Sequence, residues 1–485
     1  MNAPSIPVLT SRSLEGLRRT LRGQALTHGD EGFEDARMVW NAMVDRRPAL
    51  IVRCSDTDDV ASAIRFGRDA GLELGVRCGG HSVVGQAIPH GGLVIDLTPM
   101  NAVRIDPDAR LAYVQGGALL GDLDRASIAH GLATTAGNVS HTGVGGLTLG
   151  GGMGWLARQF GMACDNVVAF QVVTADGEIL TASDEENADL AWGLRGGGGN
   201  FGVVTEFTFR LHPVTGRALT VDFFYDEEAG PAVLRAFREL VAEAPRQATP
   251  TAWAGTSAEW PFLAPELHNT RMVNAGFVWV GDPEQGRSLI PAYRAIAAPI
   301  AEAIDEVSYL ELQSSADEPM RHGMRRYWKG HYLRGLPDAA IDAFVGRGGA
   351  TASADGWQPD GSFQAYGGAI GEVGVEDTAF SHRDALLEFV SVASWEDPDE
   401  DRARIAGERR FGAAMEPFSS GVYVNGLADE GATGVRHAYR PETLARLTAL
   451  KDRYDPENVF HLNHNIAPSG ARAQTDGARS DQTLT

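Results

Sequence analysis

The sequence predicts an α+β protein with at least two hydrophobic cores. The chain has 485 residues, which is enough to form several substantial cores. Strand-like and helix-like segments alternate over residues 36–100, whereas short alternating strands mix with helices over residues 216–410. The second pattern is typical of an antiparallel sheet with helices on one face. The 58 glycines cluster at residues 79–92, 116–154 and 196–202, which indicates ligand-binding loops rather than low complexity.

The composition indicates a globular protein that binds neither nucleic acid nor a membrane. Hydrophobic residues make up 43% of the chain and charged residues 22%, as in ordinary globular domains. The formal net charge of −22 opposes contact with nucleic acids and anionic lipid surfaces. We find neither a signal-peptide pattern nor an apolar run of the roughly 18–20 residues that a membrane span needs. Cys54, Cys78 and Cys164 are too few for a disulfide framework, so we expect a reducing, cytoplasmic location.

The first expected elements surround one glycine-rich loop. Strands are expected at residues 48–53, 72–77 and 93–97, and residues 56–70 have the apolar spacing of a helix. The loop that follows the second strand reads Arg77-Cys78-Gly79-Gly80-His81-Ser82-Val83-Val84-Gly85. Glycines in such a turn let backbone N–H groups approach an anion, as in loops that hold a pyrophosphate. The loop is not a Gly-x-Gly-x-x-Gly fingerprint opening a helix, which disfavours a nicotinamide cofactor.

Residues 111–215 are expected to form a second unit of strands and glycine loops. Its predicted strands are residues 112–115, 167–173 and 202–209. Asp176-Gly177 is a hairpin turn signal. Residues 131–161 are dominated by glycine-rich loops, with a short helix near residues 155–160.

The segment from residue 216 to about residue 410 is expected to be a separate domain. Its predicted strands are residues 273–280 and 389–395, and its predicted helices are residues 230–243, 285–302 and 338–346. Its many aromatic residues belong mainly to a core, with Trp328 and Tyr366 as candidate pocket walls. Residues 440–456 predict a helix, and the polar, aperiodic residues 471–485 predict a disordered tail.

Three more motifs accompany the histidine loop. One is a glycine-rich run from Thr135 to Arg158, which Gly161-Met162-Ala163-Cys164-Asp165-Asn166-Val167 continues. Another is Trp192-Gly193-Leu194-Arg195-Gly196-Gly197-Gly198-Gly199-Asn200-Phe201-Gly202-Val203-Val204-Thr205. The last is Tyr454-Asp455-Pro456-Glu457-Asn458-Val459-Phe460-His461-Leu462-Asn463-His464-Asn465-Ile466. Their length and order make them far more specific than a single glycine loop.

These four motifs resemble those of FAD-linked oxidases of the vanillyl-alcohol-oxidase superfamily, in the berberine-bridge-enzyme-like branch. The resemblance covers roughly residues 35–215 and 415–468. It implies an α+β fold with a PCMH-type FAD-binding domain of two α/β subdomains, and a substrate domain whose antiparallel sheet is covered by helices. The expected division is an N-terminal segment (1–35), the FAD-binding domain (36–215), the substrate-binding domain (216–410), a C-terminal berberine-bridge-like segment that returns to the FAD domain (411–470) and the tail (471–485).

The resemblance also implies how FAD is held. His81 matches the histidine that is bonded to the 8α-methyl carbon of the flavin. Bicovalent members carry a cysteine two residues after the glycine that matches Gly137, where this chain has Val139, so a single covalent link is expected, as in the hydroxynicotine oxidases. The other implied FAD-binding residues are Arg77, Gly79, Gly80, Ser82, Gly85, Gly137, Gly143, Gly145, Gly146, Gly202, Val204, Asn425 and Asn463. No metal is expected.

Four residues are candidates for catalysis. Tyr423 matches a tyrosine near the flavin, and Glu372 resembles the position of the catalytic glutamate, so either could be the base. A phenol has a pKa of about 10 and would need a positive or hydrogen-bonding neighbour for this role. His141 could face the reactive side of the flavin, and Thr142 falls at the position that gates oxygen. Threonine is close to valine in shape, which favours an oxidase.

The expected reaction is a two-electron oxidation of an alcohol or amine carbon of a small molecule, with hydride transfer to the flavin and reduction of O₂ to hydrogen peroxide. A flavin-dependent dehydrogenase with another electron acceptor is one alternative. An oxidative cyclase that tailors a natural product is a second, and a non-enzymatic binding protein is a third. The sequence identifies neither the substrate nor the oligomeric state.

Overall fold

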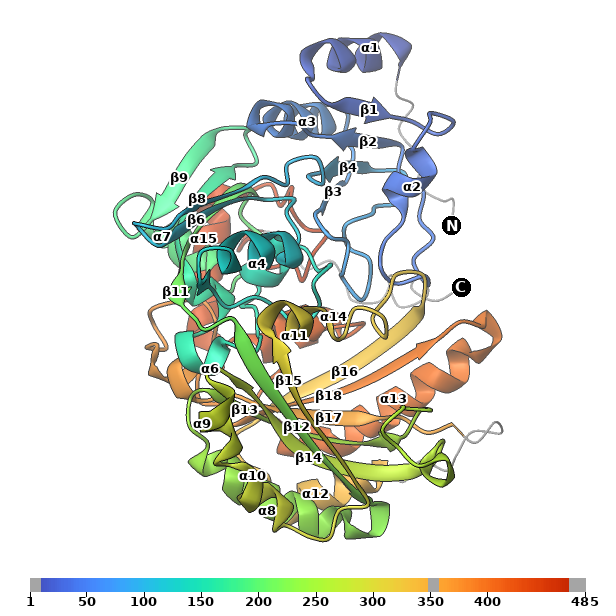
Figure 1. The fold of residues 1–485 in the computed structure, drawn as a ribbon. Coiled ribbons are helices and arrows are strands. Elements are labelled where there is room, and N and C mark those ends of the chain that lie inside the picture. Colours follow the sequence, from blue (N-terminus) through green and yellow to red (C-terminus); the bar gives the residue numbers. More distant parts are fainter. Residues whose placement is uncertain (1–9, 348–356, 471–485) are drawn as a thin grey trace.

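The protein is described here from a computed structural model that covers residues 10–347 and 357–470. Two sheets occupy the N-terminal part of the chain, and a seven-stranded sheet occupies the middle part. In Figure 1 the first sheet lies at the top of the molecule and the seven-stranded sheet at the bottom. The second sheet lies between them, at the left of the view. The expected disordered tail, residues 471–485, lies outside the described residues.

The first sheet has four strands in the order β1-β2-β4-β3. Strand β4 pairs in parallel with both β2 and β3, while β1 is antiparallel to β2. The helix expected at residues 56–70 is present, and the Asp56 side chain caps it by accepting a hydrogen bond from Asp59 N–H. The histidine loop therefore begins at the carboxyl end of a parallel strand, where α/β sheets bind ligands. The elements here are α1 (Ser11–Thr20), β1 (Gln24–Leu26), α2 (Phe33–Arg37), β2 (Leu50–Arg53), α3 (Thr57–Asp69), β3 (Leu74–Arg77) and β4 (Leu93–Asp96).

The second sheet has five strands in the order β5-β6-β10-β8-β9, and all its pairs are antiparallel. The predicted hairpin at Asp176-Gly177 joins β8 to β9, and Gly177 has a φ of +76° there. The elements are β5 (Val103–Asp106), β6 (Leu111–Gln115), α4 (Leu120–Ile128), β7 (Leu132–Ala133), α5 (Val144–Leu149), α6 (Ala157–Phe160), η1 (Ala163–Asn166), β8 (Val167–Val173), β9 (Ile179–Ser183), α7 (Ala188–Leu194), β10 (Val203–Arg210) and β11 (His212–Pro213).

The third sheet is antiparallel, in the order β15-β12-β14-β13-β17-β18-β16. Helices α8, α12 and α13 pack on one of its faces, where Phe237, Phe344 and Phe411 join a core with the strands. The expected antiparallel sheet with helices on one face is present. Its elements are β12 (Arg217–Asp226), α8 (Gly230–Glu243), β13 (Ala248–Thr256), β14 (Arg271–Val280), β15 (Ala301–Ser308), α11 (Tyr309–Ser314), β16 (Arg325–Leu333), α12 (Asp338–Val345), β17 (Gly361–Ala365), β18 (Leu387–Trp395) and α13 (Asp401–Met415).

One predicted helix of this region is wrong. Residues 285–302 form two short helices, α9 (Pro283–Arg287) and α10 (Ile290–Arg294), and then enter β15. Pro291 lacks the backbone donor that a continuous helix needs and instead lies in the first turn of α10, and Pro299 disfavours helical geometry at Ala298 before β15 begins. Strand β15 then pairs with β12 over eight residues, which extends the sheet at its edge.

The C-terminal residues return to the N-terminal sheets, as Figure 1 shows for α15. Helices α14 (Gly431–Ala438) and α15 (Pro441–Tyr454) follow the seven-stranded sheet in the chain. Leu447 and Leu450 of α15 pack in the same core as Leu190 and Leu194 of α7. The buried ammonium group of Lys451 donates to the carbonyls of Asn200 and Phe460 at 2.8 and 3.0 Å and to the Asp455 carboxylate at 2.7 Å.

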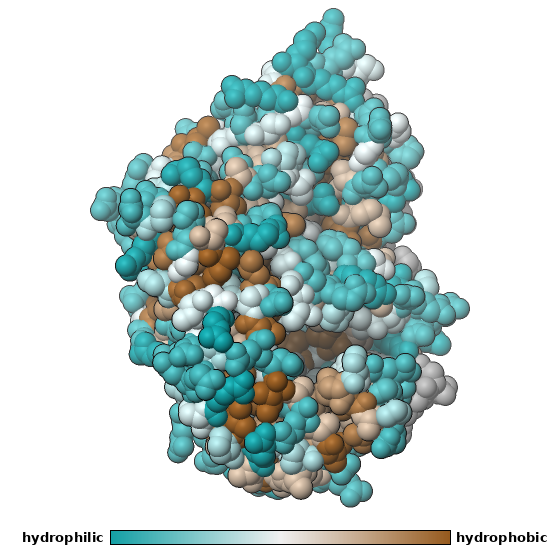
Figure 2. All heavy atoms as spheres, in the orientation of Figure 1, coloured by the Kyte–Doolittle hydropathy of each residue, from teal (hydrophilic) through white to brown (hydrophobic). Residues whose placement is uncertain are grey.

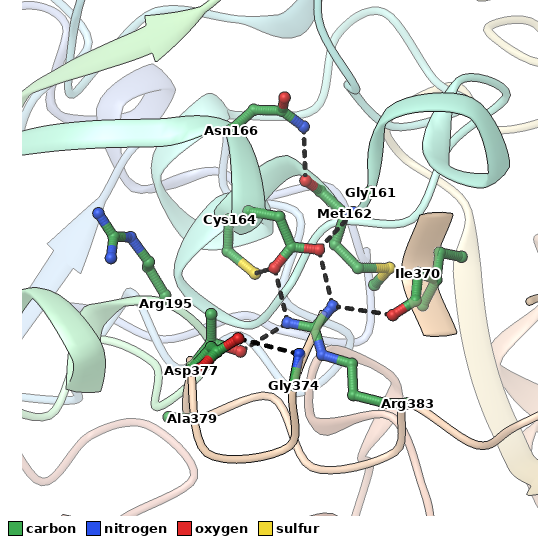
Figure 3. Close-up of polar contacts among 12 residues, drawn as sticks. Gly161, Met162, Cys164, Asn166, Arg195, Ile370, Gly374, Asp377, Ala379 and Arg383 are labelled. Carbon is green, nitrogen blue, oxygen red and sulfur yellow. Dashed lines mark hydrogen bonds and ion pairs between the residues drawn. The ribbon is translucent and has the colours of Figure 1, made fainter. Parts of the chain in front are cut away.

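A buried ion pair joins the two parts of the molecule (Figure 3). Arg383, which follows the seven-stranded sheet's β17, donates to both carboxylate oxygens of Asp165 at 2.6 and 2.7 Å. The two side chains are only 2% and 5% exposed. Asp165 also accepts from Met162 N–H, so the pair holds the turn that follows the second glycine motif.

The visible surface is mainly hydrophilic, as the teal atoms of Figure 2 show, in keeping with the net charge of −22. Among the described helices, none combines the length and the apolar character that a membrane crossing would require.

Candidate active site

The histidine loop and the second glycine loop lie against each other. A Cβ atom on Gly79 would lie 2.3 Å from the backbone nitrogen of Gly143, and a Cβ on Gly143 would lie 2.4 Å from that of Gly79. Only glycine at both positions permits this approach. Gly80 has a φ of +68°, and its carbonyl accepts a hydrogen bond from Trp40 N–H at 3.1 Å. The two motifs that the sequence separates by about 60 residues therefore form one surface.

His81 is held between both loops. Its ring stacks on Trp40 with 4.8 Å between centroids and 18° between planes. Its Nε2 lies 2.7 Å from Nδ1 of His141, and its Nδ1 lies 3.4 Å from Oγ1 of Thr142. Burial and the adjacent positive charges that His141 and His322 could carry lower the pKa of His81 to about 2. His81 is therefore neutral near pH 7, which leaves one ring nitrogen with a free lone pair.

The other predicted residues of the histidine loop shape its base. Arg77 donates to the Met38 carbonyl at 3.1 Å, and its Nε has no hydrogen-bond partner among the described residues. Gly85 has a φ of +64°, and a Cβ there would lie 2.5 Å from the Val44 side chain. The Ser82 hydroxyl accepts a long hydrogen bond from Gln86 N–H at 3.4 Å.

The second glycine loop leads into α5. Gly143 precedes the helix, and Gly145 is buried within its first turn. Gly146 is exposed, and a Cβ on it would meet no atom within 4 Å, so this part of the helix faces open space. Gly137 lies deeper, where a Cβ would lie 2.6 Å from the Leu147 side chain. The helix is too short to provide an anion site alone, but it presents small residues beside His81.

The third glycine motif and the C-terminal motif meet. Asn463 donates to the carbonyls of Gly199 and Phe460 at 3.1 and 3.2 Å, while its Oδ1 is buried with no partner in the described part of the chain. Asn465 Oδ1 is likewise buried and has no hydrogen-bond partner among the described residues. A Cβ on Gly199 would meet nothing within 4 Å. Buried acceptors without partners next to an open glycine loop fit a bound group that carries hydrogen-bond donors, as FAD does.

Gly202 and Val204 lie at the start of β10, close to this join. A Cβ on Gly202 would lie 2.7 Å from the carbonyl oxygen of Val173, so the position requires glycine. Val204 is buried, and its register with Val172 is followed by an irregularity before Glu206. The strand also lies close to Gly116, the residue that follows β6, where an added Cβ would lie 2.3 Å from the carbonyl oxygen of Val204.

Tyr423 and Asn425 lie against the second glycine motif. The Tyr423 hydroxyl oxygen accepts from Gly152 N–H at 2.9 Å and from the Asn425 amide at 3.0 Å. The same amide donates to the Leu147 carbonyl at 3.0 Å. Burial raises the pKa of Tyr423, and the nearby Glu388 carboxyl raises it further. The two donated hydrogen bonds do not overcome this rise, so Tyr423 holds its proton near pH 7.

The structure reveals an acidic residue that the sequence analysis missed. Glu388 lies on β18 and is buried next to Tyr366. Its Oε2 accepts from the Tyr366 hydroxyl at 2.7 Å, and the Tyr332 hydroxyl lies 3.4 Å from that of Tyr366. Because Tyr366 donates its only hydroxyl proton to Glu388, Tyr332 must donate to Tyr366. The rings of Tyr332 and Tyr423 are 6.3 Å apart, so the chain of groups ends next to Tyr423.

Glu388 has the protonation behaviour of a general base. Burial raises its pKa to about 7, although the hydrogen bond from Tyr366 lowers it. A pKa near the working pH is what general acid–base catalysis needs. The two-residue period of the strand explains the position, because Leu387 and Phe389 point into the helix-covered core and Glu388 points to the opposite face. A glutamate between two core residues of a strand was the available sequence signal.

The expected role of Glu372 is inconsistent with its position. Glu372 ends a short 3-10 helix, η5 (Gly368–Glu372), and its side chain is 55% exposed and paired with Arg246. An exposed carboxylate that pairs with an arginine on the surface does not lie against a buried cofactor. The buried carboxyl of this part of the molecule lies 16 residues further along the chain, at Glu388.

The two aromatic residues predicted to line a pocket lie on the same face as Glu388. Tyr366 belongs to the hydroxyl chain described above. Trp328 makes an edge-to-face contact with Trp40 at 5.5 Å between centroids, and its Nε1 has no partner among the described residues. Gln364 of β17 also faces this side, where its Oε1 accepts from the Asn138 amide at 3.2 Å. The face of the sheet opposite α8, α12 and α13 is therefore aromatic with several polar groups here, as a small-molecule site requires.

A group of three histidines surrounds the expected attachment point. Ring nitrogens of His81, His141 and His322 lie within 4.8 Å of one another, so within the described residues this group could offer metal ligands. The 2.7 Å separation of His81 and His141 is a hydrogen-bond distance. Two ligands of tetrahedral zinc lie about 3.3 Å apart, as bonds of about 2.0–2.1 Å dictate. The observed geometry therefore favours a hydrogen-bonded pair over a metal centre.

Comparison with known proteins identifies the class. A family model described as "FAD binding domain" matches residues 48–183, and one described as "Berberine and berberine like" matches residues 422–467. The chain is 30% identical over 474 residues to (R)-6-hydroxynicotine oxidase of Paenarthrobacter nicotinovorans, covering 93% of this chain and 98% of the relative. It is 29% identical over 481 residues to glucooligosaccharide oxidase of Sarocladium strictum, covering 90% and 91%. Fold and sequence together define an FAD-dependent oxidoreductase.

Solved structures agree with this class. 6-Hydroxy-D-nicotine oxidase from Arthrobacter nicotinovorans has a TM-score of 0.82 at 28% identity, with 92% of this chain and 98% of that chain covered. Physcomitrella patens BBE-like 1 has the same fold, with a TM-score of 0.83 at 24% identity and coverage of 95% and 100%.

The chain belongs to the FAD-linked oxidoreductases of the vanillyl-alcohol-oxidase superfamily, in the berberine-bridge-enzyme-like branch. The predicted family, fold class and FAD-dependent enzymatic function are confirmed.

Proposed function

We propose that the protein is an oxidase that binds FAD covalently through His81, oxidises an alcohol or amine carbon of a small molecule and reduces O₂ to hydrogen peroxide. The observation that carries the proposal is the placement of His81. It lies where the two glycine loops touch, and the hydroxyl chain ending at Glu388 belongs to the face of the seven-stranded sheet opposite α8, α12 and α13. A cofactor attachment point and a buried base thus belong to the two parts of the molecule that the Arg383–Asp165 pair holds together.

Different residues of the chain would bind FAD and accept the substrate's proton. FAD, when bound, supplies an acceptor for a hydride and passes two electrons to an oxidant. The glycine loops would hold it through backbone N–H groups, with Asn463 and Asn425 beside them. Glu388 would take the proton of the substrate's hydroxyl or amino group, either directly or through Tyr366 and Tyr332.

Tyr423 is proposed to position the substrate rather than to act as the base. Its hydroxyl oxygen already accepts two hydrogen bonds, and its own proton remains free to be donated. Its pKa is raised by burial, which opposes loss of that proton. A buried donor at this place would bind an oxygen or nitrogen atom of the substrate.

A single covalent link is proposed because Val139 stands where bicovalent members carry a cysteine. The buried Cys164 is no substitute, since its thiol faces Asp165 at 3.5 Å and burial raises its pKa well above the usual range. A solved glucooligosaccharide oxidase is described as carrying a 6-S-cysteinyl, 8α-N1-histidyl FAD, which is the bicovalent pattern. The domain division at residues 215 and 410 and a cytoplasmic location remain predictions; the three cysteines are free thiols.

The substrate is proposed to be a small molecule that carries an alcohol or amine group. The relatives named above are oxidases of a hydroxynicotine and of glucooligosaccharides, so both amine and alcohol carbons occur among their substrates. The polar and aromatic face formed by Gln364, Tyr366 and Trp328 suits a flat or sugar-like ligand.

The test combines cofactor chemistry and turnover. The purified protein is precipitated with acid, and flavin absorbance is measured in the washed pellet and in the supernatant, for the wild type and for His81→Ala. We expect flavin in the wild-type pellet and only in the supernatant of the variant. A panel of alcohols and amines is then screened for hydrogen peroxide release in air. Flavin that remains in the supernatant of the wild type would refute the covalent link, and substrate reduction without peroxide release would refute the oxidase.

A further inference from the structure

We propose that His141, held in one tautomer by Asp317, is the positioning residue and proton acceptor for attachment of FAD to His81. The inference deepens the proposed function and rests on its covalent link. It assigns a role to a segment that comes from the seven-stranded part of the chain, between α11 and β16, and that none of the four sequence motifs contains.

The hydrogen bonds determine which nitrogen of each ring carries a proton. His141 Nε2 lies 3.4 Å from the backbone carbonyl oxygen of Asp317, which can only accept, so the nitrogen must be the donor. In the neutral ring, Nδ1 of His141 is then an acceptor. It lies 2.7 Å from Nε2 of His81, which must therefore donate. His81 is left with an unprotonated Nδ1.

The remaining contacts prepare this nitrogen for bond formation. The free lone pair of His81 Nδ1 is 3.4 Å from the Thr142 hydroxyl, a weak donor that can turn away. Stacking on Trp40 fixes the plane of the ring. The Arg326 guanidinium lies over the Trp40 ring, 4.1 Å from its centroid, and holds this tryptophan in place. The imidazole is neutral, oriented and free at one nitrogen, which are the requirements of a nucleophile.

Asp317 fixes the second loop as well as the tautomer. Its carboxylate accepts from Ser140 N–H at 2.8 Å and from the Ser140 hydroxyl at 2.6 Å. The same residue thus holds the backbone that precedes His141 and the ring nitrogen of His141. Attachment of the flavin is consequently coupled to docking of the seven-stranded part against the glycine loops.

The bond-forming step balances. The new bond joins His81 Nδ1 to the 8α carbon of the flavin, which loses one C–H proton. The imidazole loses its Nε2 proton to Nδ1 of His141 along the existing hydrogen bond. The two electrons left on the flavin pass to molecular oxygen, which with two protons becomes hydrogen peroxide. His141 Nε2–H remains bonded to the Asp317 carbonyl and stabilises the positive charge on the ring.

The experiment measures attachment directly. The flavin-free full-length chain is mixed with FAD in air, and covalent product is followed by flavin fluorescence in denaturing gels and by intact mass. We expect His141→Ala to attach flavin at least tenfold more slowly than the wild type while still binding FAD, and added imidazole to restore part of the rate. In His141→Asn the amide can orient His81 but cannot take its proton, so the rate stays low and imidazole does not help.

The matched controls are neighbouring acidic residues. Asp317→Ala keeps the backbone carbonyl but removes the carboxylate that holds Ser140, so it should slow attachment, whereas the exposed Glu318→Ala, one residue away, should leave the rate unchanged. Attachment at the wild-type rate in both His141 variants would overturn the inference and leave the covalent link intact. Flavin that never becomes covalent in the wild type would instead refute the link itself, and the two failures are thus distinguished.

Discussion

At the scale of single residues, the site depends on protonation states that burial sets. His81 is kept neutral and Glu388 is brought to a pKa of about 7 by the same cause, the loss of water around a charged form. The loss of water gives these two side chains different chemical roles. A neutral imidazole is available as a nucleophile, and a carboxyl with a pKa near 7 can both accept and release a proton.

Glu388→Gln should slow anaerobic flavin reduction by substrate about 10²–10⁴-fold, because the proton acceptor is lost. The wild-type rate should rise with pH through about 7, since the base acts in its deprotonated form, and this dependence should be absent in the variant. Stopped-flow absorbance of the flavin measures both effects.

The matched control is Glu372→Gln, at the exposed carboxyl that pairs with Arg246. We expect its reduction rate and pH profile to equal those of the wild type. If Glu372→Gln loses the activity and Glu388→Gln keeps it, the base has been assigned to the wrong residue.

Thr142→Leu should slow reoxidation of the reduced enzyme by O₂ roughly tenfold, a change of about 1.4 kcal/mol in the barrier. The larger side chain would fill space beside His81, where Thr142 Oγ1 now lies 3.4 Å from Nδ1. Thr142→Val, which keeps the shape, should reoxidise like the wild type. Mixing the anaerobically reduced protein with oxygenated buffer gives the rate, and equal rates in all three proteins would exclude a gate at this position.

At the scale of elements, helices and strands with a strong local pattern were predicted correctly, whereas features set by distant partners were not. The expected helix of residues 56–70 and strand of residues 72–77 have strong local patterns and are present as α3 and β3. Strand β18 was expected to begin at residue 389, two residues late, and the face to which Glu388 belongs depends on the partner strands β17 and β16. Residues 285–302 were misassigned because apolar spacing alone does not account for their two prolines, Pro291 and Pro299.

The strands of the second sheet were predictable from the sequence, but their order in the sheet was not. Residues 112–115, 167–173 and 202–209 were correctly predicted as strands. Their arrangement, with β10 between β6 and β8, is decided by pairing between segments that lie about 90 and 30 residues apart. No local pattern contains this pairing.

At the scale of the whole molecule, function requires that the glycine loops and the seven-stranded sheet stay together. The Asp165–Arg383 pair is one buried contact that does this, and Asp317 with Ser140 is another (Figure 3 shows the first). Both connect residues that are far apart in the chain. Helix α15, near the C-terminus, packs on α7 and so attaches the C-terminal residues to the second sheet's core.

Arg383→Ala should lower the free energy of unfolding by about 3–5 kcal/mol, because it leaves the Asp165 carboxylate buried without its partner. Urea denaturation followed by far-UV circular dichroism measures the loss. Arg235→Ala, which removes an exposed pair with Asp338, should change the free energy by about 0–1 kcal/mol. A loss in Arg383→Ala no larger than in this control would show that the buried pair does not hold the two parts together.

The sequence by itself determined the family, the cofactor class and the four motifs, because glycine loops must keep their residues wherever a backbone approaches a ligand closely. It also placed His81 and the helices and strands with strong local periodicity. The tertiary structure alone decided which carboxyl is buried, which histidine contacts His81 and which loop of the seven-stranded part holds it. Burial and pairing between distant segments set those properties, since the pKa of Glu388 and the tautomer of His81 depend on neighbours that lie far away in the chain.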